Sequence, residues 1–267
     1  MVRLSEIFTT GAAVELYQRK WALRYGFFQM PKEKNGFTGD DQYLTWPHRG
    51  AYGPFLKSWA MMMEFERWFT INSHPGTIRL LSWLDEANFA SYQEATALLK
   101  ANPPDLSVGS GAGATIPEAA RAFRHKYGFG VNFEQEFSNN YFLFSRLGWN
   151  DGRNETWTFS DANWSTSLGV NIKGNGWHRP EDAFGFAYIV SGASRDNQEF
   201  LKVGGTDMLS GDGNLNYDPE KVLETFYDFQ IFKAFHFTLD YQFVANPAFN
   251  RDRGPVSIFG TRLHWDF

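Results

Sequence analysis

The sequence has no cysteine and no run of about 18 consecutive apolar residues anywhere in its 267 residues. A membrane-spanning helix needs such a run, so the class of helical membrane proteins is excluded. The absence of cysteine fits an exported protein that avoids stray disulfides, and it fits many cytosolic proteins equally well. It therefore decides little about the compartment.

A basic surface is also missing. The 25 Lys and Arg residues are outnumbered by 30 Asp and Glu, and they are scattered singly among them. Because a nucleic-acid partner demands a basic patch, we expect none. The first residues, Met1 to Thr10, lack the charged start, apolar stretch and cleavage site of a signal peptide. We expect either a trimmed mature form or a reading frame that begins inside a longer gene.

Aromatic residues are abundant, with 27 Phe, 10 Trp and 11 Tyr, while the mean hydropathy stays at -0.42. A transmembrane β-barrel has this combination, because its apolar residues occupy alternate positions and its average composition resembles that of a soluble protein. The order of the residues, and not their average, has to reveal such a surface.

The clearest alternation lies between Ala234 and Gln242. Every second residue there is apolar: Phe235, Phe237, Leu239 and Tyr241. Polar residues fill the positions between them. In a strand, successive side chains point to opposite faces, so one face of this segment is apolar and the other is polar. The stretch from Val256 to Phe267 repeats the pattern and ends on an aromatic residue.

Weaker alternation predicts further strands at Trp21–Phe27, Met61–Glu66, 75–89, Tyr127–Glu134, 140–150, 156–173, 182–192 and Leu223–Ile231. This gives about ten antiparallel strands, each near the length that crosses a bilayer when tilted. Composition predicts two short helices, at Tyr92–Ala101 and Arg195–Lys202. Turn residues separate the segments at Pro31–Gly39, Asn102–Pro104, Asn150–Gly152, Gly211–Gly213 and Asn250–Pro255. No linker is evident, so residues 1–267 are expected to form a single all-β domain.

Five blocks of sequence resemble one known family. They are Trp21–Pro31 (WALRYGFFQMP), Ser145–Glu155 (SRLGWNDGRNE), Gly174–Asp182 (GNGWHRPED), Gly211–Glu220, and Asp240–Val256 with Arg262–His264. In this order they are similar to the carbohydrate-selective porins of the outer membrane, the OprB family. The resemblance extends from about Ala13 to Phe267, with a helix-like insert near 90–118.

The resemblance implies an antiparallel transmembrane β-barrel of about sixteen strands, of which about ten are present here while the first strands and the signal peptide are missing. It implies passive diffusion of mono- or oligosaccharides through a water-filled barrel in the Gram-negative outer membrane, in contact with lipid. The terminal aromatic residue, Phe267, resembles the signal that barrels present to their assembly machinery. No cofactor or metal is implied, and the choice between monomer and homo-oligomer stays open.

Charged residues on the expected strands are the candidate site. A charge at the middle of a bilayer costs a few kcal/mol on the lipid side, so these side chains should point into the lumen and contact the passing sugar. They are Arg24, Glu64, Glu66, Arg79, Glu134, Glu136, Arg146, Glu224, Asp228, His236, Asp240 and Arg262. A solvated wall without selectivity is an equally strong interpretation.

Trp177 and Arg179, in the turn before Asp182, are the remaining candidates for sugar contact, because sugar faces pack on indole rings. For Trp177 and Trp265 a place in the aromatic girdle at the membrane rim is the stronger interpretation. The sequence Asn150–Gly152 is first of all a hairpin signal. Gly211–Gly213 is a turn signal in the same way, and its spacing departs from that of a calcium loop.

Three rival functions compete with the porin interpretation. A barrel hydrolase needs a nucleophile and a base within reach of each other, and the chain has no Gly-x-Ser-x-Gly elbow and no metal-ligand spacing of histidines, so no enzyme is expected. A soluble glycan-binding β-sandwich would explain the alternation and the tryptophans without a membrane. A non-functional porin fragment would also carry the same motifs.

Overall fold

The computed structural model describes residues 11–30, 57–104, 116–157, 161–207, 210–211 and 213–265. Within them, eleven strands form one antiparallel sheet in which every strand pairs with its neighbours in the chain. The strands are β1 (Gly11–Tyr17), β2 (Trp21–Gln29), β3 (Trp59–Ile71), β4 (His74–Ala90), β5 (Arg121–Ser138), β6 (Tyr141–Asn150), β7 (Trp164–Lys173), β8 (Ala183–Gly192), β9 (Glu220–Phe232), β10 (Phe235–Ala245) and β11 (Val256–Trp265). The prediction of an all-β, antiparallel fold is confirmed.

Both predicted helices are present with the predicted bounds, α1 (Tyr92–Ala101) and α2 (Arg195–Lys202). Each begins after a serine whose hydroxyl accepts a backbone N–H of the first turn: Ser91 from Glu94, and Ser194 from Asn197. The described residues also contain three short 3-10 segments: η2 (Glu118–Ala120), η3 (Gly174–Trp177) and η4 (Pro247–Phe249). No helix in the described part of the chain is long and apolar enough to cross a membrane.

Two predictions about the strands and their connections were wrong, and one strand was missed. The strand expected at 156–173 begins only at Trp164, and β1 was not predicted at all. The sequence Asn150–Gly152 does not close a two-residue hairpin, because β6 ends at Asn150 and its partner β7 starts 14 residues later. Instead the Asn150 side chain accepts the backbone N–H of Gly152, whose φ is +61°, and starts a longer connection. The predicted turn at Pro31–Gly39, Asp212 and Phe267 lie outside the described residues.

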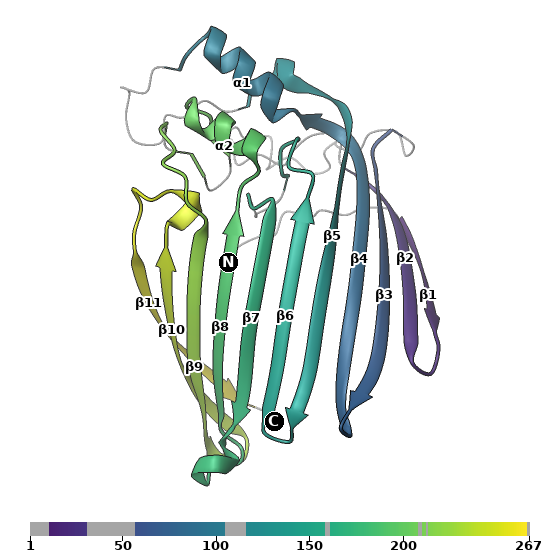
Figure 1. The fold of residues 1–267 in the computed structure, drawn as a ribbon, viewed down its shortest axis with the longest axis vertical. Helices are drawn as coiled ribbons and strands as arrows, with labels where there is room; N and C mark the ends of the chain where they lie inside the picture. The colour runs from purple at the N-terminus through teal and green to yellow at the C-terminus, as the bar shows by residue number, and fades with distance from the viewer. Residues whose placement is uncertain are drawn as a thin grey trace.

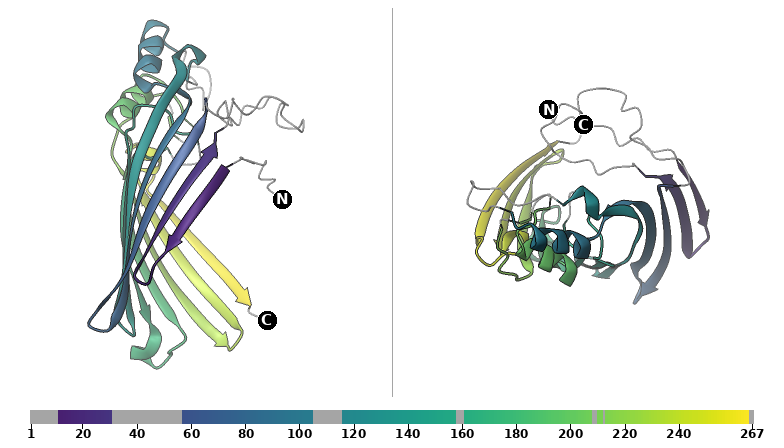
Figure 2. Two further views of the ribbon diagram at one scale, coloured as in Figure 1. Left: turned by 90° about the vertical axis from the view of Figure 1, so that its right-hand side faces the viewer. Right: turned by 90° about the horizontal axis from the view of Figure 1, so that it is seen from above.

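The connections differ in length between the two ends of the sheet. Those that carry α1, α2 and η4 lie at one end (Figure 1). The connections between β1 and β2, β3 and β4, β5 and β6, and β9 and β10 are two or three residues long and lie at the other end, together with the nine-residue β7–β8 connection that carries η3. The sheet curves into an open arc with β1 and β11 at its two margins (Figure 2).

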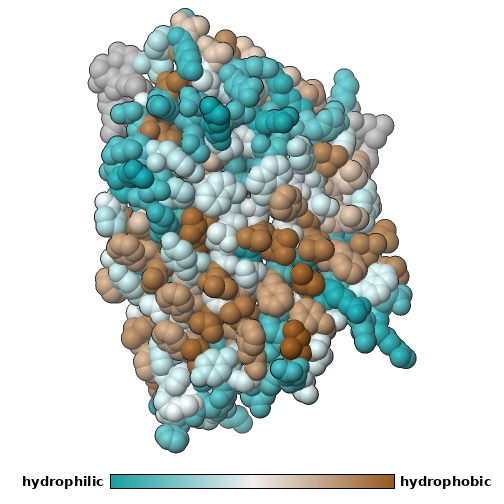
Figure 3. Space-filling model, viewed as in Figure 1, coloured by the Kyte–Doolittle hydropathy of each residue, from teal (hydrophilic) through white to brown (hydrophobic). Residues whose placement is uncertain are grey.

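The strand register sorts the side chains onto two faces, because directly paired residues point to the same side. One row across the sheet runs through Leu23, Phe65, Leu80, Val131 and Leu147. Rows of this parity are apolar and open: Leu147 is 50 % exposed and Leu168 is 54 % exposed. They belong to the convex face, where apolar side chains gather over the middle of the strands and polar ones over the long connections (Figure 3).

Among the described residues, a conventional hydrophobic core is found only at the end with the long connections. There the two helices pack on each other, and Tyr92 and Phe200 are fully buried with their ring centroids 5.5 Å apart. The other members of this core are Ala90, Ala95, Leu99, Ala120, Leu201 and Leu215. The connections therefore form a packed cap and are held by burial, in contrast to the sheet below them.

The apolar convex face leads to a first prediction. Leu168 lies near the centre of β7 on that face, and Ser165 lies on the opposite face in register with Gly148 and Ser191. In a bilayer, Leu168→Lys should lower the free energy of unfolding by about 2–4 kcal/mol, because it places an ammonium in hydrocarbon. Ser165→Lys should cost much less. Denaturant titration in lipid vesicles measures both, and equal losses would contradict the assignment of faces.

Candidate functional site

All twelve charged candidates on the strands lie on one face of the sheet, the concave one opposite the apolar band. The register connects them: Arg24 pairs with Glu64, and Glu66 pairs with Arg79. Similar rows join the rest of the set, Glu134, Glu136, Arg146, Glu224, Asp228, His236, Asp240 and Arg262, through paired residues of β4 to β11. Paired residues share a face, so the register carries the face from strand to strand. A one-residue slip between any two strands would have put the charges of the following strands on the opposite face.

Four of these strands carry a continuous ladder of ion pairs. Arg24 Nη1 lies 2.6 Å from Glu64 Oε1, and Arg24 Nη2 lies 2.6 Å from Glu66 Oε2. Arg79 in turn donates from Nε to the other oxygen of Glu66 at 2.8 Å and from Nη1 to Glu134 at 2.9 Å. Acidic and basic groups thus alternate from β2 to β5, and each guanidinium is fixed by two carboxylates.

Glu66 is the centre of this ladder. It is only 4 % exposed although it lies on the open concave face, because two guanidinium groups cover it. A carboxylate in that position is stable only while both arginines are present, since a buried charge without a partner is costly. The ladder is therefore a rigid surface, and its groups keep fixed positions toward the space that the arc encloses.

The far side of the arc has a different, acidic character. Asp228 on β9 accepts a hydrogen bond from Thr238 at 2.6 Å and lies 2.7 Å from Nδ1 of His236 on β10. Glu224 and Asp240 add two further carboxylates on the same strands. Arg262 on β11 stands in register with Thr238, next to this group.

Two candidates lie apart from both groups. The guanidinium of Arg146 sits 5.5 Å from the ring centre of Phe144 on the same strand. Glu136, near the end with the short turns, is 3.4 Å from Nδ1 of His74. The concave face thus brings its charges together in two clusters, with Arg146 between them on β6.

Trp177 and Arg179 do not lie among these charges. Trp177 donates its indole N–H to the hydroxyl of Tyr227 at 2.6 Å, and Tyr227 is in register with Phe184 and Leu239 on the apolar face. Trp177 thus belongs to the outward aromatic residues at the short-turn end, the place of a girdle. Arg179 binds Asp182 inside the same turn.

Trp265 occupies a comparable position. Its ring centroid is 5.6 Å from that of Phe235 and 5.5 Å from that of Phe232, at the same end of the sheet. These aromatic contacts lie on the face of Phe237 and Leu263, away from the charges. Both tryptophans are therefore placed as the girdle interpretation expects.

Sequence reasoning missed some charged members of the concave face, such as Glu15 and Lys126, and it did not select the uncharged ones. Asn132 pairs with both Arg79 and Arg146, and Gln242 pairs with Glu224. Their parity alone would have identified them. Among the described residues no group of three or more His, Asp or Glu side chains could hold a metal ion. The candidate site is therefore a lining of hydrogen-bonding groups.

The turn that contains Asp182 gives a prediction on pH. Burial raises the pKa of Asp182, but hydrogen bonds from Arg179, the backbone N–H of Gln230 and Tyr227 outweigh that effect, so its pKa lies below the ordinary 3.8. A carboxyl with a lowered pKa stabilises the fold above 3.8 and loses that contribution as the pH falls through the lowered value.

Asp182→Asn should therefore be less stable than the wild type at pH 7, and the difference should shrink as the pH drops below about 3.8. Denaturant unfolding over a pH series measures this difference. Glu181→Gln, a change at the exposed neighbouring carboxylate, is the control and should show little effect. A gap between Asp182→Asn and wild type that stays constant down to the most acidic conditions would refute the role of the carboxylate charge.

Comparison with known proteins bears on this arrangement. The fold is similar to the high-pH structure of Pseudomonas putida OprB, with a TM-score of 0.68 and 17 % sequence identity over 96 % of this chain and 58 % of that chain. The chain thus spans less than two thirds of that porin's length. A deletion mutant of TodX, a monoaromatic hydrocarbon channel, aligns with a TM-score of 0.37 and 10 % identity over 97 % of this chain and 74 % of that chain.

No curated protein matches the sequence. The model of one family, however, matches almost the whole chain, from residue 6 to residue 267. This match agrees with the curved antiparallel sheet, its apolar convex face and its charged concave face. The chain belongs to the carbohydrate-selective porins of the OprB family.

Proposed function

We propose that this chain forms the wall of an outer-membrane porin through which sugars diffuse passively. The observation that carries the proposal is the division of the sheet into two faces. The convex face presents apolar side chains to lipid, and the concave face collects all twelve charged strand candidates. A water-filled lumen bounded by the concave face gives these charges the solvent that lipid would deny them.

The ladder of ion pairs suits neutral, hydroxyl-rich solutes. Each sugar hydroxyl both donates and accepts hydrogen bonds, and the ladder offers guanidinium donors beside carboxylate acceptors. Because the opposite charges lie within hydrogen-bond distance of each other, their fields largely cancel at the distance of a passing ion. This ladder thus offers sugars direct contacts and itself gives a bare ion little preference.

The lengths of the connections support an orientation in the Gram-negative outer membrane. Barrels of this membrane have short periplasmic turns and longer extracellular loops. The end with α1, α2 and η4 would then face the exterior, and the girdle of Trp177 and Trp265 would lie at the periplasmic rim. β11 would present the C-terminal strand to the assembly machinery; its last residue, Phe267, is part of this proposal through the family resemblance alone. Homo-oligomers are not part of it.

The soluble β-sandwich is the weaker alternative. A sandwich buries its apolar faces between two sheets, whereas the eleven described strands make one sheet. The large apolar residues of this sheet remain exposed on the convex side: Phe259 is 81 % exposed and Leu263 is 69 % exposed. Exposure on that scale in water would lead to aggregation. No feature of the described residues favours an enzyme.

Liposome swelling tests the proposal. The full chain is reconstituted in lipid vesicles, and the rates of uptake are compared for glucose, maltotriose and the anion gluconate. We expect vesicles with the chain to admit the two sugars faster than empty vesicles, and to admit glucose faster than gluconate. Swelling no faster than in empty vesicles would reject the proposal for this chain and favour a non-functional fragment.

The centre of the ladder gives a further prediction. Glu66→Gln removes the carboxylate that Arg24 and Arg79 share, so the lumen gains one positive charge. The uptake of gluconate relative to glucose should rise several-fold, because the field at the lining becomes less repulsive to anions. Arg79→Gln should shift the same ratio in the opposite direction. The control Glu181→Gln, in the exposed turn, should leave the ratio unchanged, and equal ratios in all variants would show that the ladder does not set selectivity.

A further inference from the structure

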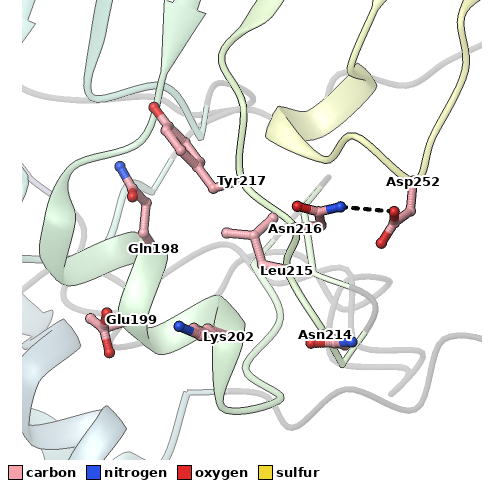
Figure 4. A pocket seen from close by; sticks show the side chains of 8 residues that line it. All are labelled: Gln198, Glu199, Lys202, Asn214, Leu215, Asn216, Tyr217 and Asp252. Carbon is pink, nitrogen blue, oxygen red and sulfur yellow. Dashed lines mark hydrogen bonds between the residues drawn. The ribbon is translucent and has the colours of Figure 1, made fainter.

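A cavity of about 490 Å³ opens within the cap, at the end that carries the long connections (Figure 4). Its size falls within the range of roughly 300–1,000 Å³ that is usual for small-molecule sites. Side chains of α2 line one side, and the β8–β9 and β10–β11 connections line the other. The lining residues are Gln198, Glu199, Lys202, Asn214, Leu215, Asn216, Tyr217 and Asp252.

The two connections that meet at this cavity are tied together. Arg251 donates its backbone N–H to the carbonyl of Asn216 at 2.9 Å, and Tyr217 forms an isolated β-bridge with Asn250. The side chain of Asn216 donates to Asp252 Oδ1 at 3.0 Å. The wall is therefore formed before any ligand arrives, which lowers the entropy lost on binding.

The base of the cavity is part of the buried core. Leu215 is 7 % exposed and packs with Phe200 and Leu201, and Tyr217 packs against the same group. Helix α2 is held in place by its own cap, with Ser194 accepting the N–H of Asn197 at 3.1 Å. The polar side chains thus project from a rigid support, and they are not the ends of free loops.

The chemistry of the lining matches a saccharide. Amide groups of Gln198, Asn214 and Asn216 both donate and accept hydrogen bonds, as sugar hydroxyls do. The partly buried ring of Tyr217 offers apolar surface for the C–H face of a sugar ring. With two carboxylates, Glu199 and Asp252, and one ammonium, Lys202, the formal charge is -1, which disfavours anions. No metal-ligand cluster exists among the described residues.

We propose that this pocket binds a neutral saccharide at the outer mouth of the channel before the sugar enters the lumen. The inference rests on the proposed porin function for its purpose, because a site at the mouth keeps sugar close to the lumen when the external concentration is low. Binding there has to be weak enough for release, as conduction requires. The open shape of the pocket and its exposed polar rim of Glu199, Lys202, Asn214, Asn216 and Asp252 suit such transient binding.

Calorimetry on the full chain in detergent micelles tests the site, with glucose and maltotriose as ligands and gluconate as the charged comparison. The double variant Asn214→Ala/Asn216→Ala removes two exposed amides from one wall, and Glu199→Ala removes an exposed carboxylate from the other. The wild type should bind the neutral sugars, and the double variant should bind them roughly tenfold more weakly. Glu199→Ala should weaken binding several-fold.

The matched control is Asn175→Ala. Asn175 is also an exposed asparagine whose amide donates to another side chain, Asn140, but it lies in the turn at the opposite end. It should bind sugar as the wild type does. Equal affinity in the wild type and both pocket variants, or no binding by the wild type, would overturn the inference.

Liposome swelling separates this result from the porin proposal. At sugar concentrations far above the dissociation constant, the pocket variants should admit sugar at the wild-type rate, and only at low concentration should they be slower. If the wild type causes swelling and the variants bind sugar as the wild type does, the porin proposal stands and the pocket proposal is rejected. If binding depends on the pocket residues but no swelling occurs, the pocket proposal stands and the porin proposal is rejected.

Discussion

Pairing of backbone hydrogen bonds is the constraint on which this structure depends. Hydrocarbon offers no water to an unpaired N–H or C=O, so a chain that crosses it with strands must form an unbroken series of backbone hydrogen bonds. Here this series of hydrogen bonds runs from β1 to β11, with each strand beside its neighbour in sequence. The backbone pairing fixes the register, and the register fixes which side chains face lipid. The same demand applies to the margins of the arc, where β1 and β11 need partners in a membrane.

The pairing of the strands into one sheet inverts the usual relation between apolar residues and burial. On the sheet, Phe259 and Leu263 are open, whereas Glu66 is nearly inaccessible because two arginines cover it. Conventional burial returns only where the chain leaves the sheet, around Tyr92 and Phe200. Two solvents explain the contrast. Strand residues are sorted between lipid and lumen water, and cap residues have to exclude water from each other.

Period-two alternation predicted most of the sheet and placed all twelve charged candidates on one face, because the parity of a residue is local and the register then transmits it. The failures came where parity carries little information. In β1, Gly11, Ala12 and Ala13 give no contrast between faces. At Asn150–Gly152 the turn chemistry was correct, since Gly152 has a positive φ, but a turn signal cannot say whether the next strand follows at once or after a longer connection.

The cavity in the cap lay beyond sequence reasoning for a different reason. Its residues come from two connections that neither parity nor spacing relates, and contacts such as those of Asn216 with Arg251 and Asp252 and the bridge between Tyr217 and Asn250 bring them together. Strand residues are constrained at every second position by lipid, whereas connections outside the bilayer meet no such rule. A charged residue of the lining can therefore be substituted only together with the ion-pair partners that hold it. In the cap, by contrast, polar residues around Leu215 can be exchanged without disturbing the sheet. On the proposed function, a porin built in this way would be able to alter recognition at the proposed site in its cap and keep the same passage.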